Sequence, residues 1–202
     1  MYRPSAFAVD DPAVLHGVIR DRVFATIAAI MDGGIRFAYA PVVLDGNGVR
    51  FHLAMRNPLA QVADGTRLWL SFAAGDAYVS PDWYKTIATV PTWNYIAVEG
   101  AGLVRRLSRE ELRGLVVDLS AQEEARLAPK PPWLIEKVPP SRTEALLNVI
   151  VGFSLAFERL EGKFKLSQDK NPDDIAGAVA GLEARGDPAS LAIARAMRKL
   201  PR

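Results

Sequence analysis

Two glycine-containing turns constrain the fold of this chain more than any other feature of its sequence. DGG at residues 32–34 and DGNG at residues 45–48 each join two apolar segments. Short links of this kind are typical of β-hairpins. The apolar segments that they connect are VFATIAAIM, IRFAYAPVVL and VRFHLAM. We therefore expect these three segments to be consecutive antiparallel strands.

Further strands are predicted along the rest of the chain. Their segments are TRLWLSF, DAYVS, residues 93–107 and GFSLAFERLEG. Gly100 and Gly102 mark points where the third of these can bend or bulge. A series of short strands with mostly tight links favours an antiparallel barrel over a parallel α/β sheet.

Helices are expected to decorate this barrel, because capping signals precede several amphipathic segments. These signals are Asp11 with Pro12, Ser108 with Glu111, and Ser141 with Glu144. Two more capped helices after residue 170 predict a terminal helical hairpin. The predicted architecture is mainly β, with a barrel domain over residues 1–170 and a helical extension over residues 171–202.

Composition excludes several classes of site. The chain of 202 residues has no cysteine and two histidines, which rules out disulfides, thiolate metal sites and cysteine nucleophiles and does not favour a histidine metal cluster. No apolar run approaches the roughly 20 residues that span a bilayer, and the first residues lack the apolar core of a signal peptide. We therefore expect a cytoplasmic protein with no membrane partner.

The common catalytic signatures are absent from the sequence. There is no G-x-S-x-G elbow, Walker phosphate loop, H-E-x-x-H or G-x-G-x-x-G motif. Glu110 with Glu111, and Asp173 with Asp174, stand at predicted helix starts, where the helix dipole explains them. We assign these carboxylate pairs no chemistry.

The first candidate site is the segment VRFHLAMRNP. Strand alternation places Val49, Phe51, Leu53 and Met55 on one face, and Arg50, His52, Ala54 and Arg56 on the other. The second face carries cations and is followed by Asn57 and Pro58, which can start a short helix. It is either a phosphate site or the solvated outer face of a strand.

The second candidate is a pair of aromatic clusters. Large rings in loops need a reason, because exposed apolar area is costly. The residues concerned are Ser80, Trp83 and Tyr84 in YVSPDWYK, and Trp93, Asn94 and Tyr95 in VPTWNY. The rings either cover the end of the barrel or face a planar ligand.

The third candidate is the segment EGKFKLSQDK near residue 165. Lys163 and Lys165 share one side of a predicted strand, and Lys170, Ser167 and Gln168 follow closely. This cluster is either a cationic, solubilising strand end or a second contact for an anion. Spacing does not separate the two interpretations.

The order of these segments resembles a known family. MYRPSAF, HLA with NP at residues 52–58, YVSPDWY, VPTWNY and LEGKFKLSQ together span almost the whole chain. They resemble the PaiB-type FMN-binding family of negative transcriptional regulators, a branch of the flavin split-barrel superfamily. The resemblance implies a six-stranded split β-barrel that forms a homodimer and binds FMN in a groove between subunits.

The resemblance also implies a set of cofactor contacts. These are Arg50, His52, Leu53, Ala54, Asn57, Ser80, Trp83, Tyr84, Trp93, Asn94, Tyr95, Lys163, Lys165 and Gln168. Three positions depart from the family pattern: Tyr39 and Glu99 replace histidines, and Met55 replaces an arginine that reappears one position later as Arg56.

Three functions remain open on this basis. The family implies a transcriptional regulator, although the sequence shows no helix-turn-helix. Its one compact basic stretch is at the end of the sequence and contains Arg195, Arg198, Lys199 and Arg202. This stretch is either a contact for DNA phosphates or a solvated tail. An FMN-dependent oxidoreductase is an alternative, although His52 is the one histidine near the motifs. A family member that has lost its cofactor is the third.

Overall fold

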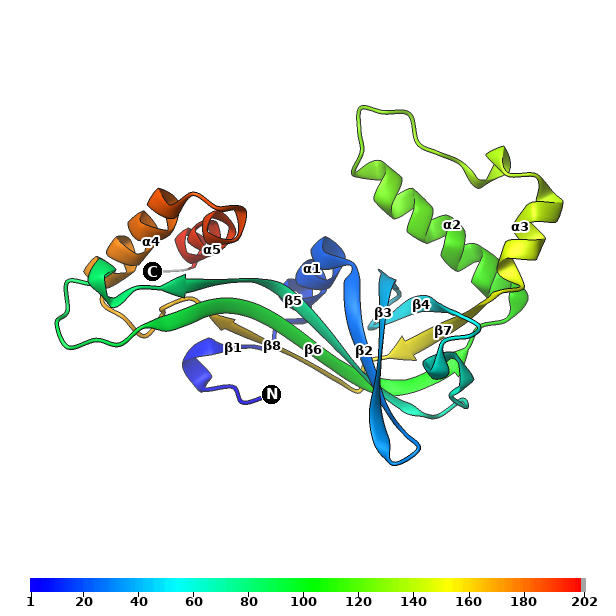
Figure 1. Cartoon of the computed structure of the whole chain (residues 1–202), viewed down its shortest axis with the longest axis horizontal. Helices are drawn as coiled ribbons and strands as arrows, with labels where there is room; N and C mark the ends of the chain where they lie inside the picture. Colours follow the sequence, from blue (N-terminus) through cyan, green and yellow to red (C-terminus); the bar gives the residue numbers. More distant parts are fainter. Residues whose placement is uncertain (201–202) are drawn as a thin grey trace. The chain divides into compact units, whose positions relative to one another are not determined.

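The structure, a computed structural model, describes residues 1–200 and is shown in Figure 1. Those residues form one eight-stranded sheet and five α-helices, divided between two compact units. The strands are β1 (Ala8–Val9), β2 (Phe24–Met31), β3 (Gly34–Leu44), β4 (Gly48–Ala54), β5 (Arg67–Val79), β6 (Thr92–Arg106), β7 (Ile150–Ala156) and β8 (Arg159–Lys165). The α-helices are α1 (Pro12–Arg22), α2 (Arg109–Ala125), α3 (Pro140–Leu147), α4 (Pro172–Arg185) and α5 (Pro188–Arg198). Short 3₁₀ helices are η1 (Ser5–Phe7), η2 (Pro58–Gln61), η3 (Pro81–Trp83) and η4 (Ile135–Lys137).

The barrel unit comprises Ile19–Phe72 and Gly100–Leu160. Its strands form a closed ring in the order β5, β2, β3, β4, β7 and β6, with β6 again beside β5. Closure leaves no free edge for another strand to pair with. The antiparallel barrel predicted from the sequence is thus confirmed, and the ring has the six strands that the family resemblance implied.

Strand alternation fills the inside of the ring with apolar side chains. On β4, Phe51 is fully buried, and its Cα partner on β7 is the equally buried Phe153. Their rings stack with centroids 5.5 Å apart. Burying rings of this size is worth about 1.5–3 kcal/mol each, so this cross-strand pair anchors the barrel core.

Helix α2 packs on the barrel through a small apolar cluster. Leu112 and Leu115 contact Val43 of β3 and Leu147 of α3. The predicted capping box is confirmed: the Ser108 hydroxyl accepts from the Glu111 N–H, and the Glu111 carboxylate accepts from the Ser108 N–H at 2.7 Å.

The sheet unit comprises Met1–Val18, Ala73–Glu99 and the chain from Glu161 onward. Its strands follow the order β1, β8, β6 and β5, where β5 and β6 continue from the barrel unit. Helices α4 and α5 form the predicted terminal hairpin and pack against the sheet through a buried apolar cluster (Figure 1). Residues 201–202 of the predicted extension lie outside the described part of the chain.

Two glycines of α4 let η3 approach the helix closely. A Cβ atom on Gly177 would lie 1.9 Å from the Trp83 carbonyl oxygen, and one on Gly181 would lie 2.2 Å from the Trp83 ring. The indole therefore rests directly on the helix backbone. Trp83 in this way fixes the loop that follows β5.

Several sequence predictions need correction. TRLWLSF and DAYVS fall almost entirely within the single strand β5, because the residues between them are also in strand conformation. GFSLAFERLEG forms two strands, since Phe157 and Glu158 turn the chain between β7 and β8. The predicted Ser141–Glu144 capping box is wrong: Pro140 already occupies the first turn of α3, and the N-cap is Pro139.

Met55 was also placed wrongly. It was expected on the same face as Val49, Phe51 and Leu53, which the structure buries, but β4 ends at Ala54 and the Met55 side chain is 45% exposed. Strand alternation stops deciding which face a side chain takes once the chain turns.

We predict that Gly177→Ala destabilises the fold by about 1–3 kcal/mol, because the added methyl group must displace the backbone of η3. Gly114→Ala in α2 is the matched control. Its Cβ meets nothing within 4 Å, so it should stabilise the protein by about 0.5–1 kcal/mol. Urea unfolding of both variants measures the difference. Equal free energies of unfolding would contradict the close packing of Trp83 on α4.

Candidate functional site

The predicted cofactor contacts fall into both units. Those in the barrel unit are Arg50, His52, Leu53, Ala54 and Asn57. Those in the sheet unit are Ser80, Trp83, Tyr84, Trp93, Asn94, Tyr95, Lys163, Lys165 and Gln168.

Arg50 of β4 already has two acidic partners. Its guanidinium lies 2.8 Å from an Asp118 carboxylate oxygen of α2 and 3.2 Å from an Asp45 carboxylate oxygen. Two carboxylates neutralise the charge on which phosphate binding would depend. In this structure Arg50 links α2 to the barrel.

His52 is half-buried on the same strand. Within residues 1–200 its Nδ1 atom is buried and has no hydrogen-bond partner. Burial lowers the pKa of the imidazole below its ordinary value of 6.5, because desolvation disfavours the charged form. His52 is therefore predominantly neutral at pH 7.

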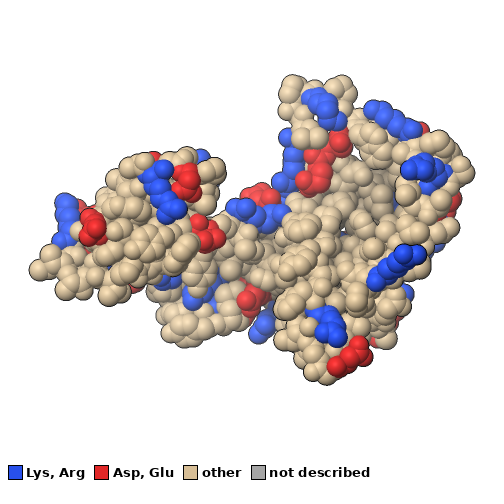
Figure 2. Space-filling view, viewed as in Figure 1, with Lys and Arg blue, Asp and Glu red and all other residues tan. Residues whose placement is uncertain are grey.

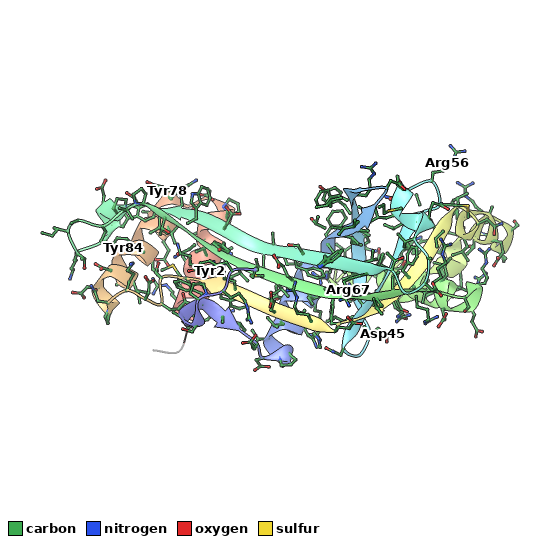
Figure 3. All side chains as sticks on the ribbon, turned by 90° about the horizontal axis from the view of Figure 1, so that it is seen from below. Tyr2, Asp45, Arg56, Arg67, Tyr78 and Tyr84 are labelled. Atoms are coloured by element: carbon green, nitrogen blue, oxygen red, sulfur yellow. The ribbon has the colours of Figure 1, made fainter. Side chains whose placement is uncertain are left out.

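The end of β4 is the accessible part of this segment. Leu53 is buried in the barrel, whereas Ala54 is exposed. Asn57 caps η2, its side-chain oxygen accepting from the Leu59 N–H at 2.9 Å. Between them the exposed Arg56 has no carboxylate partner among residues 1–200, and Figure 3 shows it pointing away from the ribbon.

The outer face of the β2–β3 hairpin is apolar and exposed. Pairing of Ile30 with Ile35 and of Ala28 with Phe37 brings these side chains to one face, since the intervening Ala29 is fully buried. The exposed members of this face, which we call the apolar hairpin face, are Phe24, Ile30, Ile35, Phe37 and Tyr39, at 57–64% exposure.

The sequence prediction did not include this face, apart from Tyr39. The signal was available, because VFATIAAIM has apolar residues at both alternating sets of positions. A strand with one solvated face normally alternates apolar and polar residues, so apolar residues on both faces indicate that both are covered.

In the sheet unit, the YVSPDWYK segment forms a capped turn. The Ser80 side chain accepts from the Asp82 N–H to start η3. Trp83 rests on α4, and the Tyr84 ring packs against the same apolar cluster. Trp83 thus has a packing role, while the Tyr84 hydroxyl is buried and has no partner in the described chain.

The rings of VPTWNY take different surroundings. Trp93 is 54% exposed and meets Tyr78 edge to face, with ring centroids 6.2 Å apart. Tyr95 is half-buried beside Lys163, whose ammonium lies 5.3 Å from the Tyr95 ring centroid and 5.2 Å from that of Tyr2. Two aromatic faces therefore stabilise the buried Lys163 cation.

Asn94 and Gln168 hold the chain after β8. Asn94 is fully buried and donates to the Ser167 hydroxyl at 2.9 Å. The Gln168 side chain accepts from the Leu166 N–H at 2.6 Å and donates to the Phe164 carbonyl. Both amides are used to fix this turn.

Lys165 lines a cavity of about 410 Å³. Its ammonium donates to the Thr92 hydroxyl and, at 2.8 Å, to the Trp93 carbonyl oxygen. Burial lowers the pKa of Lys165 from its ordinary value. The cavity brings Lys165 together with Tyr84 and Asn94, three of the predicted contacts.

Asp174 has a role that the sequence prediction missed. Its buried carboxylate accepts from the backbone N–H groups of Lys85 (2.8 Å) and Thr86 (3.0 Å) and from the Asn171 side chain. These hydrogen bonds, that of Thr86 first, lower the pKa of Asp174. The carboxylate thus secures the loop after η3, beyond the helix-start role assigned from the sequence.

Glu99 lies in the sheet unit, where one carboxylate oxygen is 3.2 Å from the Met1 ammonium. Glu161 binds the same ammonium at 2.7 Å. Hydrogen bonding to Glu161 raises the pKa of the Met1 amine.

No helix among residues 1–200 has the length and apolar character needed to cross a membrane. The described residues contain no group of three or more His, Asp or Glu side chains that would hold a metal ion.

Comparison with known proteins identifies relatives over almost the whole chain. A family model described as "Putative FMN-binding domain" matches residues 1–159. An uncharacterised protein of Emericella nidulans is 30% identical over 98% of this chain and 97% of its own length. "Protease synthase and sporulation protein PAI 2" of Bacillus subtilis is 28% identical over 98% of this chain and 96% of its own length.

A solved structure supports the fold. The FAD and heme binding protein from Mycobacterium smegmatis has a TM-score of 0.61 and 18% identity, covering 84% of this chain and 78% of that chain. At this identity the likeness shows the fold alone. The resemblance identified from the sequence motifs is confirmed by the family model and by the Bacillus relative.

We predict that His52 makes the fold sensitive to mild acid. Because burial holds its pKa below 6.5, the unfolded chain binds this proton more readily, and stability falls as the pH drops from about 6.5 through the lower pKa of the folded state. Tm should therefore fall less for His52→Gln than for the wild type between about pH 7.5 and about pH 5.5. The comparison at the higher pH, where the imidazole is neutral in both states, isolates any packing loss. An identical fall in both proteins would contradict the assignment.

Proposed function

Because this chain belongs to the family described as "Putative FMN-binding domain", we propose that it is a homodimeric FMN-binding protein of the PaiB type. The observation that carries the proposal is the apolar hairpin face of the barrel unit. A flavin ring is planar and largely apolar, so it needs a covered apolar surface with a few placed polar groups.

The residues around this face fit the cofactor. Phe37 and Tyr39 present exposed side chains on β3, and η2 packs against the same strand. Directly before η2, Arg56 offers a guanidinium without a carboxylate partner among the described residues. We infer that the flavin ring lies on the apolar hairpin face and that Arg56 binds the phosphate group.

The accessible neighbours of Arg56 complete this contact. Ala54 is exposed and small, and Asn57 ends the turn that presents the guanidinium. Arg56 then takes the role that the family pattern gives to an arginine at the position of Met55. Because β4 ends at Ala54, strand alternation does not apply to residues 55 and 56. Moving the arginine from position 55 to position 56 therefore does not force its side chain to the opposite face.

The same face supports self-association. Monomeric proteins rarely expose contiguous apolar patches larger than a few hundred Å², and the apolar hairpin face presents Phe24, Ile30, Ile35, Phe37 and Tyr39 together. A second copy of the chain would cover these side chains and exclude water from a bound flavin. We infer a two-fold dimer in which this face is paired with itself.

A role in regulation follows from the relatives rather than from a DNA-binding surface. The name of the Bacillus subtilis protein refers to protease synthase and sporulation. In this chain, Arg198 is held by Glu183 through two hydrogen bonds of 2.9 Å, while Arg202 lies outside the described residues. On the face seen in Figure 2, basic and acidic side chains are interspersed within each unit. We therefore propose that any control of gene expression is indirect.

Flavin chemistry supports a second candidate, an oxidoreductase. Bound FMN supplies hydride transfer, and the protein supplies orientation and a dry site. Tyr39 carries a hydroxyl group on the apolar hairpin face, and this hydroxyl can donate a hydrogen bond to a substrate there. Bleaching of bound flavin by a nicotinamide donor, with recovery on adding an acceptor, would support this candidate.

We predict that the purified protein retains FMN absorbance after gel filtration. Arg56→Met should weaken FMN binding by about tenfold or more, because a charge-assisted hydrogen bond is lost, and should leave riboflavin binding unchanged. Arg67→Met is the matched control, since Arg67 is also an exposed guanidinium of the barrel unit and pairs with Glu158 at 2.6 Å. A protein that stays colourless after FMN addition would overturn the proposal.

We predict that Phe37→Glu converts the dimer into a monomer, because the introduced charge is desolvated when two apolar hairpin faces meet. Light scattering after gel filtration measures the mass. Leu103→Glu, at another exposed apolar strand position of the barrel unit, should leave the dimer intact. A monomeric wild type, or a Phe37→Glu variant that remains dimeric, would refute this interface.

A further inference from the structure

The cavity of the sheet unit is a built site that the proposed flavin contact does not use. It has a volume of about 410 Å³ and is lined from four segments: η1, the loop after η3, the start of β6 and the chain after β8. This volume lies within the range of about 300–1,000 Å³ typical of small-molecule pockets. Its chemistry follows from three groups, Lys165, Tyr84 and Lys170.

Lys165 keeps one donor for a ligand. An ammonium group has three N–H bonds, and two of those of Lys165 donate to the Thr92 hydroxyl and the Trp93 carbonyl oxygen. Neither acceptor carries a charge. The Lys165 ammonium is thus held in position by neutral groups. It has no carboxylate within ion-pair distance among residues 1–200, and the Asp169 carboxylate acts on it from farther away.

The Tyr84 hydroxyl is the second available donor. The hydroxyl is buried and makes no hydrogen bond, as donor or as acceptor, with any atom of residues 1–200. Buried polar groups are nearly always satisfied, and an exception calls for an explanation. Tyr84 lines the cavity, and because its hydroxyl is buried, the side chain has to shift for a ligand oxygen to provide the missing partner.

Lys170 and Asp169 set the charge of the cavity. Their side chains lie 3.0 Å apart as an ion pair, and hydrogen bonding to Asp169 raises the pKa of Lys170. Together with Lys165, the lining carries two ammonium groups and one carboxylate, a net charge of one positive unit. A singly charged anion matches this balance.

The backbone around the cavity is also unusual. Ser167 and Ala88 adopt left-handed conformations, with φ of +65° and +62°, which side chains other than glycine and asparagine seldom take. Backbone of this kind concentrates at ligand and active sites, where surrounding contacts impose it. Buried Asn94 holds Ser167 through two hydrogen bonds at 2.9 and 3.3 Å.

The remaining walls are apolar. Phe7, Ala88 and Val90 line the cavity beside the polar groups, so the ligand should combine one anionic group with a hydrocarbon body. We infer that the cavity binds a small carboxylic acid distinct from the flavin. Its carboxylate accepts from the free N–H of Lys165 and from the Tyr84 hydroxyl.

Isothermal titration with benzoate tests this site, with benzyl alcohol as the neutral probe of similar shape. We expect benzoate to bind the wild-type protein at least about tenfold more tightly than benzyl alcohol, the effect of a charge-assisted hydrogen bond. Lys165→Met and Tyr84→Phe should each weaken benzoate binding by about tenfold and leave benzyl alcohol binding unchanged.

The Tyr84→Phe variant also separates binding from folding. Since its hydroxyl has no protein partner, removing that oxygen should not lower Tm, whereas a structural role for the hydroxyl would. Lys137→Met, in η4 of the barrel unit, is the matched control for loss of a lysine and should bind benzoate normally.

Two results would overturn the inference. The first is benzoate binding no tighter than that of benzyl alcohol, or unaffected by Lys165→Met and Tyr84→Phe. The second is displacement of benzoate by FMN together with loss of the preference for FMN over riboflavin in Lys165→Met, which would assign the cavity to the phosphate of the cofactor. Retention of FMN by these variants with loss of benzoate would support two separate sites.

Discussion

Pairing of β6 with β7 closes the six-stranded ring, and the rest of the barrel unit depends on that closure. Val104 pairs with Leu155, and Gly102 allows the approach, because a Cβ there would lie 2.0 Å from the Ala156 carbonyl oxygen. Closure satisfies the backbone groups of both strands, since a barrel has no free edge. It also fixes which side chains point inward, including the stacked pair Phe51 and Phe153.

The outer surface of the closed barrel has two parts, one covered by a helix and one exposed. Helix α2 packs on the end of β3 at Val43 and on β4 and β7, and it supplies Asp118 to Arg50, so that this cation serves packing. On the β2–β3 hairpin, Phe37 and Tyr39 remain exposed and are not covered by any of residues 1–200. The proposed dimer and flavin contact lie on this uncovered side, where apolar area is still available for binding.

In the sheet unit, buried contacts support the walls of a cavity with polar lining groups. Asp174 secures the loop after η3, Trp83 fixes that loop on α4, and Asn94 holds the turn at Ser167. These buried contacts use up the hydrogen-bonding capacity of the amides and carboxylates nearby. The donors that remain available are one N–H of Lys165 and the hydroxyl of Tyr84. These two donors define the proposed acid site.

The sequence by itself determined the local elements: Gly-containing turns fixed the β2–β3–β4 hairpins, and the Ser108–Glu111 spacing fixed the start of α2, because these depend on neighbouring residues. Its motifs also determined the family. Only the tertiary structure decided that Arg50 is bound by Asp118 and that the Tyr84 hydroxyl lacks a partner among residues 1–200. Those outcomes depend on groups far apart in the chain, and sequence spacing carries no record of which charges and hydrogen bonds such groups exchange.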